Sequence, residues 1–361
     1  MKTKFALSLV AAVACIAAFA ESLTCASPDG KNALTFARTA RLRGFNLLDM
    51  FSVDYTSGTF SEEDFELIEK WGFNFARLPI DYRFLVKGRD SKNWTDFDED
   101  ALRRLDAAVE MGRRHKVHVQ LCLHRIPGYC VNPPAEPTDL FSDPEALRVA
   151  CLHWKTLAKR YRGVPAAELS INLFNEPKSI DEKKYVAVVE ALVAAIREVD
   201  AERPIVVDGI SYGRIVPKSL LGKGLGFSWH CYDPFFVTHH KAPWADPSGV
   251  SEEPRWPVDG RSPEKWLAEE TYDAKGWSEA IASGAPVHVG EFGVWRKTRH
   301  EVALALMEDQ LKMWKGLGVG WALWNLRGDF GVLDSGRDDV AYEDFGGHKL
   351  DRQMLELLQR Y

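Results

Sequence analysis

The sequence lacks the excess of positive charge that marks nucleic-acid-binding proteins. Its 46 Lys and Arg residues are outnumbered by 52 Asp and Glu residues, which gives a formal net charge of −6. Contacts with nucleic acid or an anionic membrane need clustered Lys and Arg. Basic pairs such as Arg103-Arg104 lie among acidic or apolar residues at helical spacing, which is typical of a solvated helix face. We therefore expect neither a nucleic acid nor a membrane as a partner.

Long apolar runs are also missing after the first twenty residues, so no later segment is expected to span a bilayer. The N-terminus begins with two lysines and continues with an apolar run over residues 5–18. It ends in Ala18-Phe19-Ala20, the small–any–small pattern of a cleavage site. We expect residues 1–20 to be a signal peptide, residues 21–361 to form the mature chain, and the protein to be secreted or periplasmic.

Cysteines are few, and one of the six, Cys15, falls in the expected signal peptide. Five remain, so at least one thiol is unpaired in an oxidising compartment. Cys122 and Cys231 lie in predicted strands and are expected to be small core residues. A partial pairing stays open for Cys25, Cys130 and Cys151, and a lipid anchor on Cys15 or Cys25 is the alternative to a soluble secreted form. No Cys or His spacing suggests a metal site, so we expect neither a metal nor an organic cofactor.

Internal repeats, low-complexity tracts and Ser- or Pro-rich linkers are absent, which favours a single domain. What the chain does contain is an alternation of short strand-like runs with longer amphipathic ones. Repeated βα units indicate a parallel sheet with helices outside it, and eight of them fit a (β/α)8 TIM barrel. The expected strands cover 42–48, 73–80, 117–124, 168–175, 205–209, 226–232, 287–291 and 319–326, and the expected helices cover 62–71, 99–115, 144–161, 182–199, 264–282 and 301–315.

The third predicted strand supports the barrel because apolar residues alternate with polar or small ones over 118–124. This period of two predicts Val119, Leu121 and Leu123 under the helices and the other side chains inside the barrel. His124 then ends the strand at the C-terminal mouth, where barrel enzymes hold their active sites.

Two motifs close predicted strands. An Asn-Glu-Pro string around Glu176 closes the fourth strand, and a Gly-Glu-Phe-Gly string around Glu291 closes the seventh. With these motifs the chain resembles glycoside hydrolase family 5, a large family of cellulases and mannanases built on (β/α)8 barrels. The resemblance extends from about Arg43 to the C-terminus, and it implies a glycosidase whose active site lies at the C-terminal ends of the strands.

Six further positions match the family's active-site residue types, each at a strand end. By this similarity, Arg77 and Tyr232 hydrogen-bond Glu291, and His230 neighbours Glu176. By the same similarity, the remaining three residues contact one sugar, and Asn175 binds the 2-hydroxyl of that sugar. The matching residues are Arg77, His124, Asn175, His230, Tyr232 and Trp324.

The chemistry explains why two glutamates are needed. Hydrolysis with retention takes two carboxyl groups about 5–5.5 Å apart across the anomeric carbon. Glu176 is expected to protonate the leaving oxygen and then to activate water, while Glu291 is expected to form the covalent glycosyl-enzyme. The two residues are far apart in the sequence, so a closed fold has to bring them together.

The expected partner is a β-linked polysaccharide or oligosaccharide, and the expected enzyme is a monomeric endo-β-1,4-glucanase. The choice of β-1,4-glucan rests on analogy with the family. Mannan, β-1,3-glucan, xyloglucan and an exo-acting glucosidase stay open, and Trp244, Trp256 and Trp295 are loop residues that could stack on sugars. The rivals from other classes are a non-catalytic carbohydrate-binding barrel and a hydrolase of another bond, such as an esterase.

Overall fold

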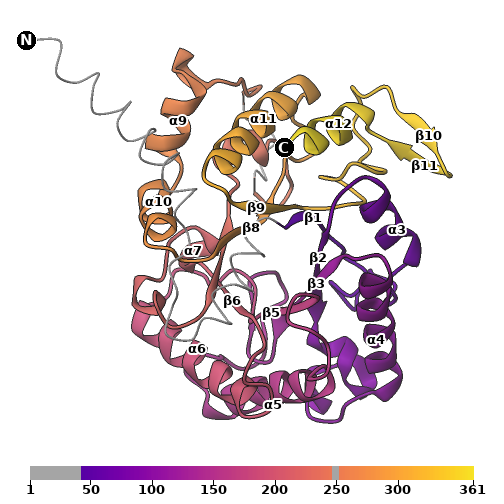
Figure 1. The fold of residues 1–361 in the computed structure, drawn as a ribbon, viewed down its shortest axis with the longest axis vertical. Coiled ribbons are helices and arrows are strands. Elements are labelled where there is room, and N and C mark those ends of the chain that lie inside the picture. Colours follow the sequence, from indigo (N-terminus) through magenta and orange to yellow (C-terminus); the bar gives the residue numbers. More distant parts are fainter. Residues whose placement is uncertain (1–41, 246–251) are drawn as a thin grey trace, which may run out of the picture.

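Eight parallel strands close into a barrel in the computed structural model, which describes residues 42–245 and 252–361 (Figure 1). The strands lie in the order β2-β1-β9-β8-β7-β6-β5-β3, and pairing of β2 with β3 closes the ring. The predicted TIM barrel is therefore confirmed. The barrel strands are β1 (Arg43–Asn46), β2 (Phe75–Asp81), β3 (His118–Ile126), β5 (Leu169–Asn172), β6 (Ile205–Asp208), β7 (Gly226–His230), β8 (Val287–Phe292) and β9 (Gly320–Leu323).

The strands of the barrel are buried on both faces, as parallel strands between helices and a filled interior must be. On β3, Val119 faces outward, because its side chain lies against Gly112 of a surrounding helix. Cys122 faces inward, where its sulfur lies 3.2 Å from the Arg77 guanidinium. His118 also points inward and bonds Ser170 of β5 at 2.8 Å. The predicted alternation along this strand is confirmed at these positions.

Four of the six main helices begin at an aspartate that caps them, and an apolar stripe on each faces the barrel. Asp98, Asp143, Asp181 and Asp351 each accept backbone N–H groups from the first turn of the helix that follows. The C-terminal helix α12 was not among the predicted elements. The helices are α3 (Glu62–Lys70), α4 (Glu99–Arg114), α5 (Pro144–Arg160), α6 (Glu182–Arg197), α11 (His300–Gly316) and α12 (Arg352–Arg360).

The single helix predicted over 264–282 is wrong. The structure has two helices there, α9 (Pro263–Glu270) and α10 (Ala274–Ala282). Contacts with distant residues hold the break: Tyr272 donates its N–H to the Asp233 carboxylate, and the Asp273 carboxylate accepts from Val216 N–H. Asp273 itself has a φ of 53°, a left-handed conformation that ends a helix.

The remaining elements are short and lie in the connections. No long helix separates β6 from β7 in the described chain; α7 and η4 occupy that place. These elements are η1 (Tyr82–Leu85), η2 (Lys87–Arg89), η3 (Ser91–Asn93), β4 (Tyr129–Cys130), α7 (Ile210–Gly213), η4 (Lys218–Leu220), α8 (Phe235–Thr238), η5 (Val258–Gly260), β10 (Glu343–Phe345) and β11 (His348–Leu350).

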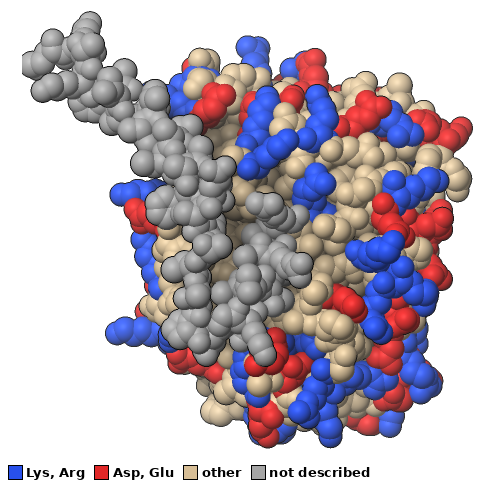
Figure 2. Space-filling model, viewed as in Figure 1, with Lys and Arg blue, Asp and Glu red and all other residues tan. Residues whose placement is uncertain are grey.

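The surface carries charges of both signs. On the face that Figure 2 shows, the described basic and acidic side chains are interspersed. Among the described helices, none has the length and apolarity to cross a membrane. Cys122, Cys130, Cys151 and Cys231 are free thiols, while the expected signal peptide and Cys25 lie outside the described residues.

Candidate active site

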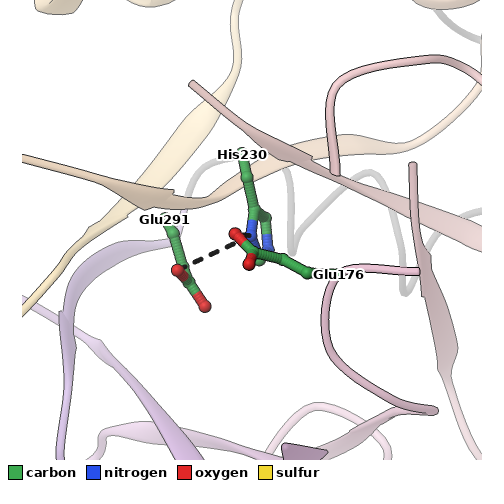
Figure 3. A group of neighbouring side chains, drawn as sticks. All are labelled: Glu176, His230 and Glu291. Atoms are coloured by element: carbon green, nitrogen blue, oxygen red, sulfur yellow. Dashed lines mark hydrogen bonds and ion pairs between the residues drawn. The ribbon is translucent and has the colours of Figure 1, made fainter. Parts of the chain in front are cut away.

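The side chains of Glu176 and Glu291 lie close together beside His230 (Figure 3). Glu291 lies within β8, and Glu176 follows the end of β5. A carboxylate oxygen from each glutamate and a ring nitrogen of His230 all lie within 4.8 Å of one another. The Glu176 side chain keeps 16% of its exposure and the Glu291 side chain 4%. A molecule entering from solvent can therefore reach Glu176, while Glu291 lies deeper.

Both oxygens of Glu291 accept hydrogen bonds. Arg77 donates from Nη1 to Oε1 at 2.7 Å, and the Tyr232 hydroxyl donates to Oε2 at 3.1 Å. Burial raises the pKa of the Glu291 carboxyl to about 7, against the lowering effect of His230 and Arg77, and the negative charge of Glu176 adds to the rise. The carboxyl is thus held firmly in place in a site that also favours binding a proton.

Arg77 is a fully buried hub on β2. Its Nε donates to Asn172 at 3.0 Å, its Nη1 also donates to Asn46 at 3.0 Å, and its Nη2 donates to Asn175 at 2.7 Å. Because five donors in a rigid plane are satisfied from several strands, the guanidinium fixes the position of Glu291. Its position on β2 gives it access to partners on β1, β3, β5 and β8.

Glu176 is held by its backbone as well as its side chain. It has a φ of 46°, in the left-handed region that non-glycine residues rarely adopt. Its N–H donates to Asp208 Oδ2 at 2.9 Å, and its carbonyl oxygen accepts from the Tyr129 hydroxyl at 2.7 Å. The side-chain Oε1 lies 2.9 Å from His230 Nδ1. These contacts fix the direction in which the carboxyl points.

His230 is buried between carboxylates. Its Nδ1 faces Glu176, and its Nε2 lies 3.3 Å from Asp208 Oδ2. Burial opposes a positive charge here, yet the carboxylates of Glu291, Asp208 and Glu176 together raise the pKa of His230 to about 9. The raised pKa favours the imidazolium form of the ring at neutral pH.

The other three predicted residues lie near the pair. Asn175 has its side-chain oxygen bound by Arg77, which leaves Nδ2 as a buried donor without a partner among the described residues. The His124 ring lies 5.8 Å from the Trp324 ring, and Phe51 contacts both. Burial lowers the pKa of His124 well below its usual value, so its ring is neutral. The structure thus brings all eight predicted site residues into one region.

Five further residues belong to this region and were not predicted. Asn46, Asn172 and Asp208 are polar residues that each end a barrel strand, where barrel enzymes hold active-site residues. Tyr129 lies in the short strand β4 and Phe51 in a loop, and their local sequence gave no such signal. The five reach the site through the contacts of Arg77, Glu176 and Trp324 described above.

The three loop tryptophans differ in their surroundings. Trp244 is 61% exposed and contacts Trp295 and Phe330, which in turn packs on Tyr232. Trp295 is nearly buried beneath Trp244. Trp256 instead donates to Asp309 of α11 and packs on Trp266 of α9, so its place is structural.

The sequence also holds a Gly-x-Ser-x-Gly string at residues 209–213, where none was expected. This spacing is the nucleophile elbow of many esterases, in which a histidine activates the serine. Ser211 Oγ instead lies 3.4 Å from Ser179 Oγ, and no histidine bonds it within the described chain. The string therefore does not form an esterase site here.

The close group of Glu176, His230 and Glu291 also deserves a test as a metal site. Both Glu291 oxygens already accept hydrogen bonds, the Arg77 cation borders the group, and the raised pKa of His230, a member of the group, favours its positive form. A divalent ion would have to displace these donors and approach two positive charges. The donor set fits acid–base chemistry on two carboxyls, and we assign no metal to it.

A family model described as cellulase, glycosyl hydrolase family 5, matches residues 32–329. The chain belongs to this family. It is therefore a glycosidase that hydrolyses O-glycosyl bonds, of the retaining, cellulase-like kind, and the resemblance seen in the two glutamate motifs is confirmed. Membership of a glycosidase family also argues against the esterase alternative.

Several relatives and solved structures match most of this chain. Endoglucanase C of Acetivibrio thermocellus is 26% identical over 322 residues, covering 81% of this chain and 92% of that protein. A crystal structure of a glycoside hydrolase is 32% identical with a TM-score of 0.80, over 89% of this chain and 99% of that one. Cel5A of Thermotoga maritima, in complex with cellobiose, has a TM-score of 0.73 at 21% identity, over 90% and 98% of the two chains.

Proposed function

We propose that the protein is a secreted endo-β-1,4-glucanase in which Glu176 is the acid/base and Glu291 the nucleophile. The observation that supports a retaining mechanism is the distance between the two residues: one carboxylate oxygen of each lies within 4.8 Å of the other. That separation is near the distance for retaining enzymes and far below that for inverting ones, which need room for a water between the carboxyl groups.

The different surroundings of the two carboxyls assign the roles. Carboxyl groups this close share one proton over a range of pH. Both Glu291 oxygens accept hydrogen bonds from protein donors, whereas Glu176 accepts from His230 at Oε1 only. The shared proton is better placed on the free oxygen of Glu176, which is also the more exposed side chain.

In the first step, Glu291 attacks the anomeric carbon while Glu176 gives its proton to the departing glycosidic oxygen. The bond to the leaving sugar breaks and a covalent glycosyl–Glu291 ester forms. In the second step, ionised Glu176 takes a proton from a water molecule, which attacks the same carbon and releases Glu291. Both steps use the same two side chains, so no cofactor takes part in the scheme.

The remaining residues support the sugar that reacts. Asn175 offers its unpartnered Nδ2 to the 2-hydroxyl, a contact that strengthens in the transition state. Trp324 and His124 present ring faces to the same sugar. Arg77 and Tyr232 hold Glu291, and Arg77 also orients Asn175 through its side-chain oxygen.

The β-1,4-glucan substrate is proposed from relatives that are named endoglucanases and match most of this chain. The exposed Trp244 supports binding of a polymer, because an aromatic face at a rim can stack on a sugar beyond the one that reacts. Secretion is proposed from the N-terminal sequence, and the monomer is proposed from the family.

A panel of soluble polysaccharides tests the substrate. We expect release of reducing ends from carboxymethyl cellulose and mixed-linkage β-glucan, with an early fall in viscosity that marks cutting within the chain. Mannan, β-1,3-glucan, xyloglucan and xylan complete the panel. A preference for any of these four would replace β-1,4-glucan. Hydrolysis without loss of viscosity would make the enzyme exo-acting, and the Glu291→Gln variant is the inactive control.

Trapping the covalent intermediate tests the mechanism. Treatment with 2,4-dinitrophenyl 2-deoxy-2-fluoro-β-cellobioside should label one residue, and peptide mass spectrometry should place the label on Glu291. A label on another residue would overturn the nucleophile assignment. The Glu176→Ala variant should regain activity on an activated aryl cellobioside when azide is added, because azide needs no general base.

A further inference from the structure

Asp208 is a fully buried carboxylate at the end of β6 that the scheme above does not use. Its Oδ1 accepts from Asn172 Nδ2 at 2.8 Å, and its Oδ2 accepts from Glu176 N–H at 2.9 Å. The same Oδ2 lies 3.3 Å from His230 Nε2 and 3.9 Å from Arg77 Nη2. One carboxylate thus touches the backbone of Glu176 and both cations of the site.

We propose that Asp208 is a positioning residue, which fixes the backbone of Glu176 and keeps His230 and Glu176 in their working protonation states. This inference rests on the proposed role of Glu176 as the acid/base. Asp208 acts through its neighbours and does not touch the reacting sugar.

Asp208 acts first on the backbone of Glu176. A non-glycine residue in the left-handed region costs on the order of 1 kcal/mol and persists only where its surroundings hold it. Asp208 holds the N–H of Glu176, and Tyr129 holds its carbonyl oxygen. With both ends of the residue bound, the carboxyl projects toward Glu291 and His230 in one direction.

Asp208 acts second on the imidazole ring of His230. His230 has Glu176 on Nδ1 and Asp208 on Nε2, so each nitrogen faces a carboxylate. The ring is also confined by two glycines: a Cβ at Gly213 would lie 2.6 Å from His230 Cγ, and one at Gly290 would lie 3.2 Å from Nε2. His230 therefore has little freedom to turn away from either carboxylate.

The charges around His230 come from five elements or their loops. Two cations, Arg77 and His230, face the carboxyl groups of Glu291, Asp208 and Glu176. Without the Asp208 carboxylate the surroundings of this group would be more positive, which favours loss of a proton from the Glu176–Glu291 pair. The titratable groups that face His230 are Arg77 of β2, His124 of β3, Glu176 after β5, Asp208 of β6, and His288 and Glu291 of β8.

The Asp208→Asn variant tests the charge route. Loss of one negative charge lowers the pKa of every neighbouring acid, so the alkaline limb of the kcat/KM profile should move to lower pH by about one unit. The control is Asp351→Asn. Asp351 is equally buried, accepts a backbone N–H at the start of α12, and pairs with His300 at 2.7 Å, away from this site. Its profile should keep the wild-type limbs.

Leaving groups separate positioning from a general structural effect. On phenyl β-cellobioside, which needs a proton donor, kcat/KM of Asp208→Asn should fall about 10- to 100-fold, part of the usual gain from general acid catalysis. On 2,4-dinitrophenyl β-cellobioside, whose leaving group needs no proton, it should change less than threefold. Equal losses on both substrates, or an unmoved alkaline limb, would overturn the inference.

The Glu176→Ala variant, assayed in parallel, tells this failure from failure of the proposed function. If Glu176→Ala shows the leaving-group pattern and Asp208→Asn does not, only the role of Asp208 fails. If neither variant shows it, the role of Glu176 fails as well. Should Asp208→Asn not fold, nitrogen-15 NMR of the wild-type histidines still decides, because His230 should hold protons on both ring nitrogens at pH 8, and a neutral ring would refute the charge route.

Discussion

Arg77 connects more of the site than any other side chain described above, because its guanidinium bonds Glu291 and three asparagines from inside the barrel. A lysine would keep the charge but could not reach these partners at once. The buried asparagine oxygens would then lose their donors, at about 1–3 kcal/mol each.

We predict that Arg77→Lys lowers kcat/KM on a soluble β-glucan by about 10²- to 10³-fold, similar to the loss of a preorganised donor in other enzymes. Steady-state kinetics and urea unfolding measure the two effects. Arg203→Lys is the matched control, since Arg203 is as buried and bonds Asp200 and backbone carbonyls outside the site. It should lose stability and keep its activity; equal kinetics in both variants would contradict the role of Arg77.

The protonation of the Glu176–Glu291 pair limits kcat/KM at alkaline pH. Burial raises the pKa of the Glu291 carboxyl to about 7, and the nearby carboxyl of Glu176 shares that proton. A raised pKa means that the proton is held below pH 7 and lost above it. Since the first step needs one proton on the pair, kcat/KM should fall as the pH rises through about 7.

A pH profile of kcat/KM under subsaturating substrate measures this loss. The same profile for 2,4-dinitrophenyl β-cellobioside is the internal control, because its cleavage does not need the proton. Its alkaline limb should lie at higher pH. Coinciding limbs for the natural and activated substrates would show that the proton lost on the alkaline side is not the one that Glu176 donates.

At the scale of elements, the short segment after β6 packs against the ring of His230. Ser211, Tyr212 and Gly213 all have positive φ, and a Cβ on Gly213 would collide with the His230 ring. Gly222, in the same connection, has an almost equal φ of 77° but no heavy atom within 4 Å of its ideal Cβ. The two glycines thus share the conformational strain and differ in their contact.

We predict that Gly213→Ala and Gly222→Ala each lose about 1 kcal/mol of unfolding free energy from the strained φ. Gly213→Ala should also lower kcat at least tenfold, because His230 must move away from Glu176. Gly222→Ala should keep its kcat. Thermal unfolding and kinetics on one preparation separate the effects, and unchanged kcat in Gly213→Ala would show that His230 tolerates the displacement.

The loop after β7 carries Trp244, whose side chain is 61% exposed and whose ring contacts Phe330, which packs on Tyr232. If it stacks on a distal sugar, Trp244→Ala should lower kcat/KM on carboxymethyl cellulose about tenfold, equal to about 1.4 kcal/mol. Cleavage of 2,4-dinitrophenyl β-cellobioside should stay within twofold. Trp256→Ala is the control, since Trp256 is tied to Asp309 and should affect stability only. An equal loss on both substrates would rule out the distal contact.

The elements show what a single sequence can and cannot predict. All eight barrel strands and five of the helices lie within a few residues of their predicted ranges, because periodicity and acidic caps are local signals. The break between α9 and α10 was missed because Asp233 and Val216, distant in sequence, hold it. Tyr129 was missed for the same reason, because its hydrogen bond to Glu176 forms only in the closed barrel.

At the scale of the whole molecule, buried neutral histidines govern the response to acid. Burial lowers the pKa of His118 and His153 to about 4 and that of His239 and His288 to about 3, and it lowers the pKa of His124 well below its usual value. In the unfolded chain these rings take up protons near pH 6.5. Between pH 6.5 and 4 the unfolded state therefore binds more protons than the native state, so stability falls as the pH falls.

Each buried histidine should cost about 2 kcal/mol of unfolding free energy between pH 7 and pH 5. Glu291 and Asp49 act in the opposite direction, because burial raises the pKa of Glu291 to about 7 and that of Asp49 to about 6, and the folded state gains their protons first. His230, whose pKa is raised to about 9, also stabilises the folded state as the pH falls. Five groups outweigh three, and we predict a net loss of several kcal/mol. Urea unfolding at both pH values measures this loss of unfolding free energy. His153→Gln should reduce the loss by the contribution of one histidine, about 2 kcal/mol. Equal stability at pH 7 and pH 5 would mean that these histidines bind protons in the folded barrel, which their burial makes costly.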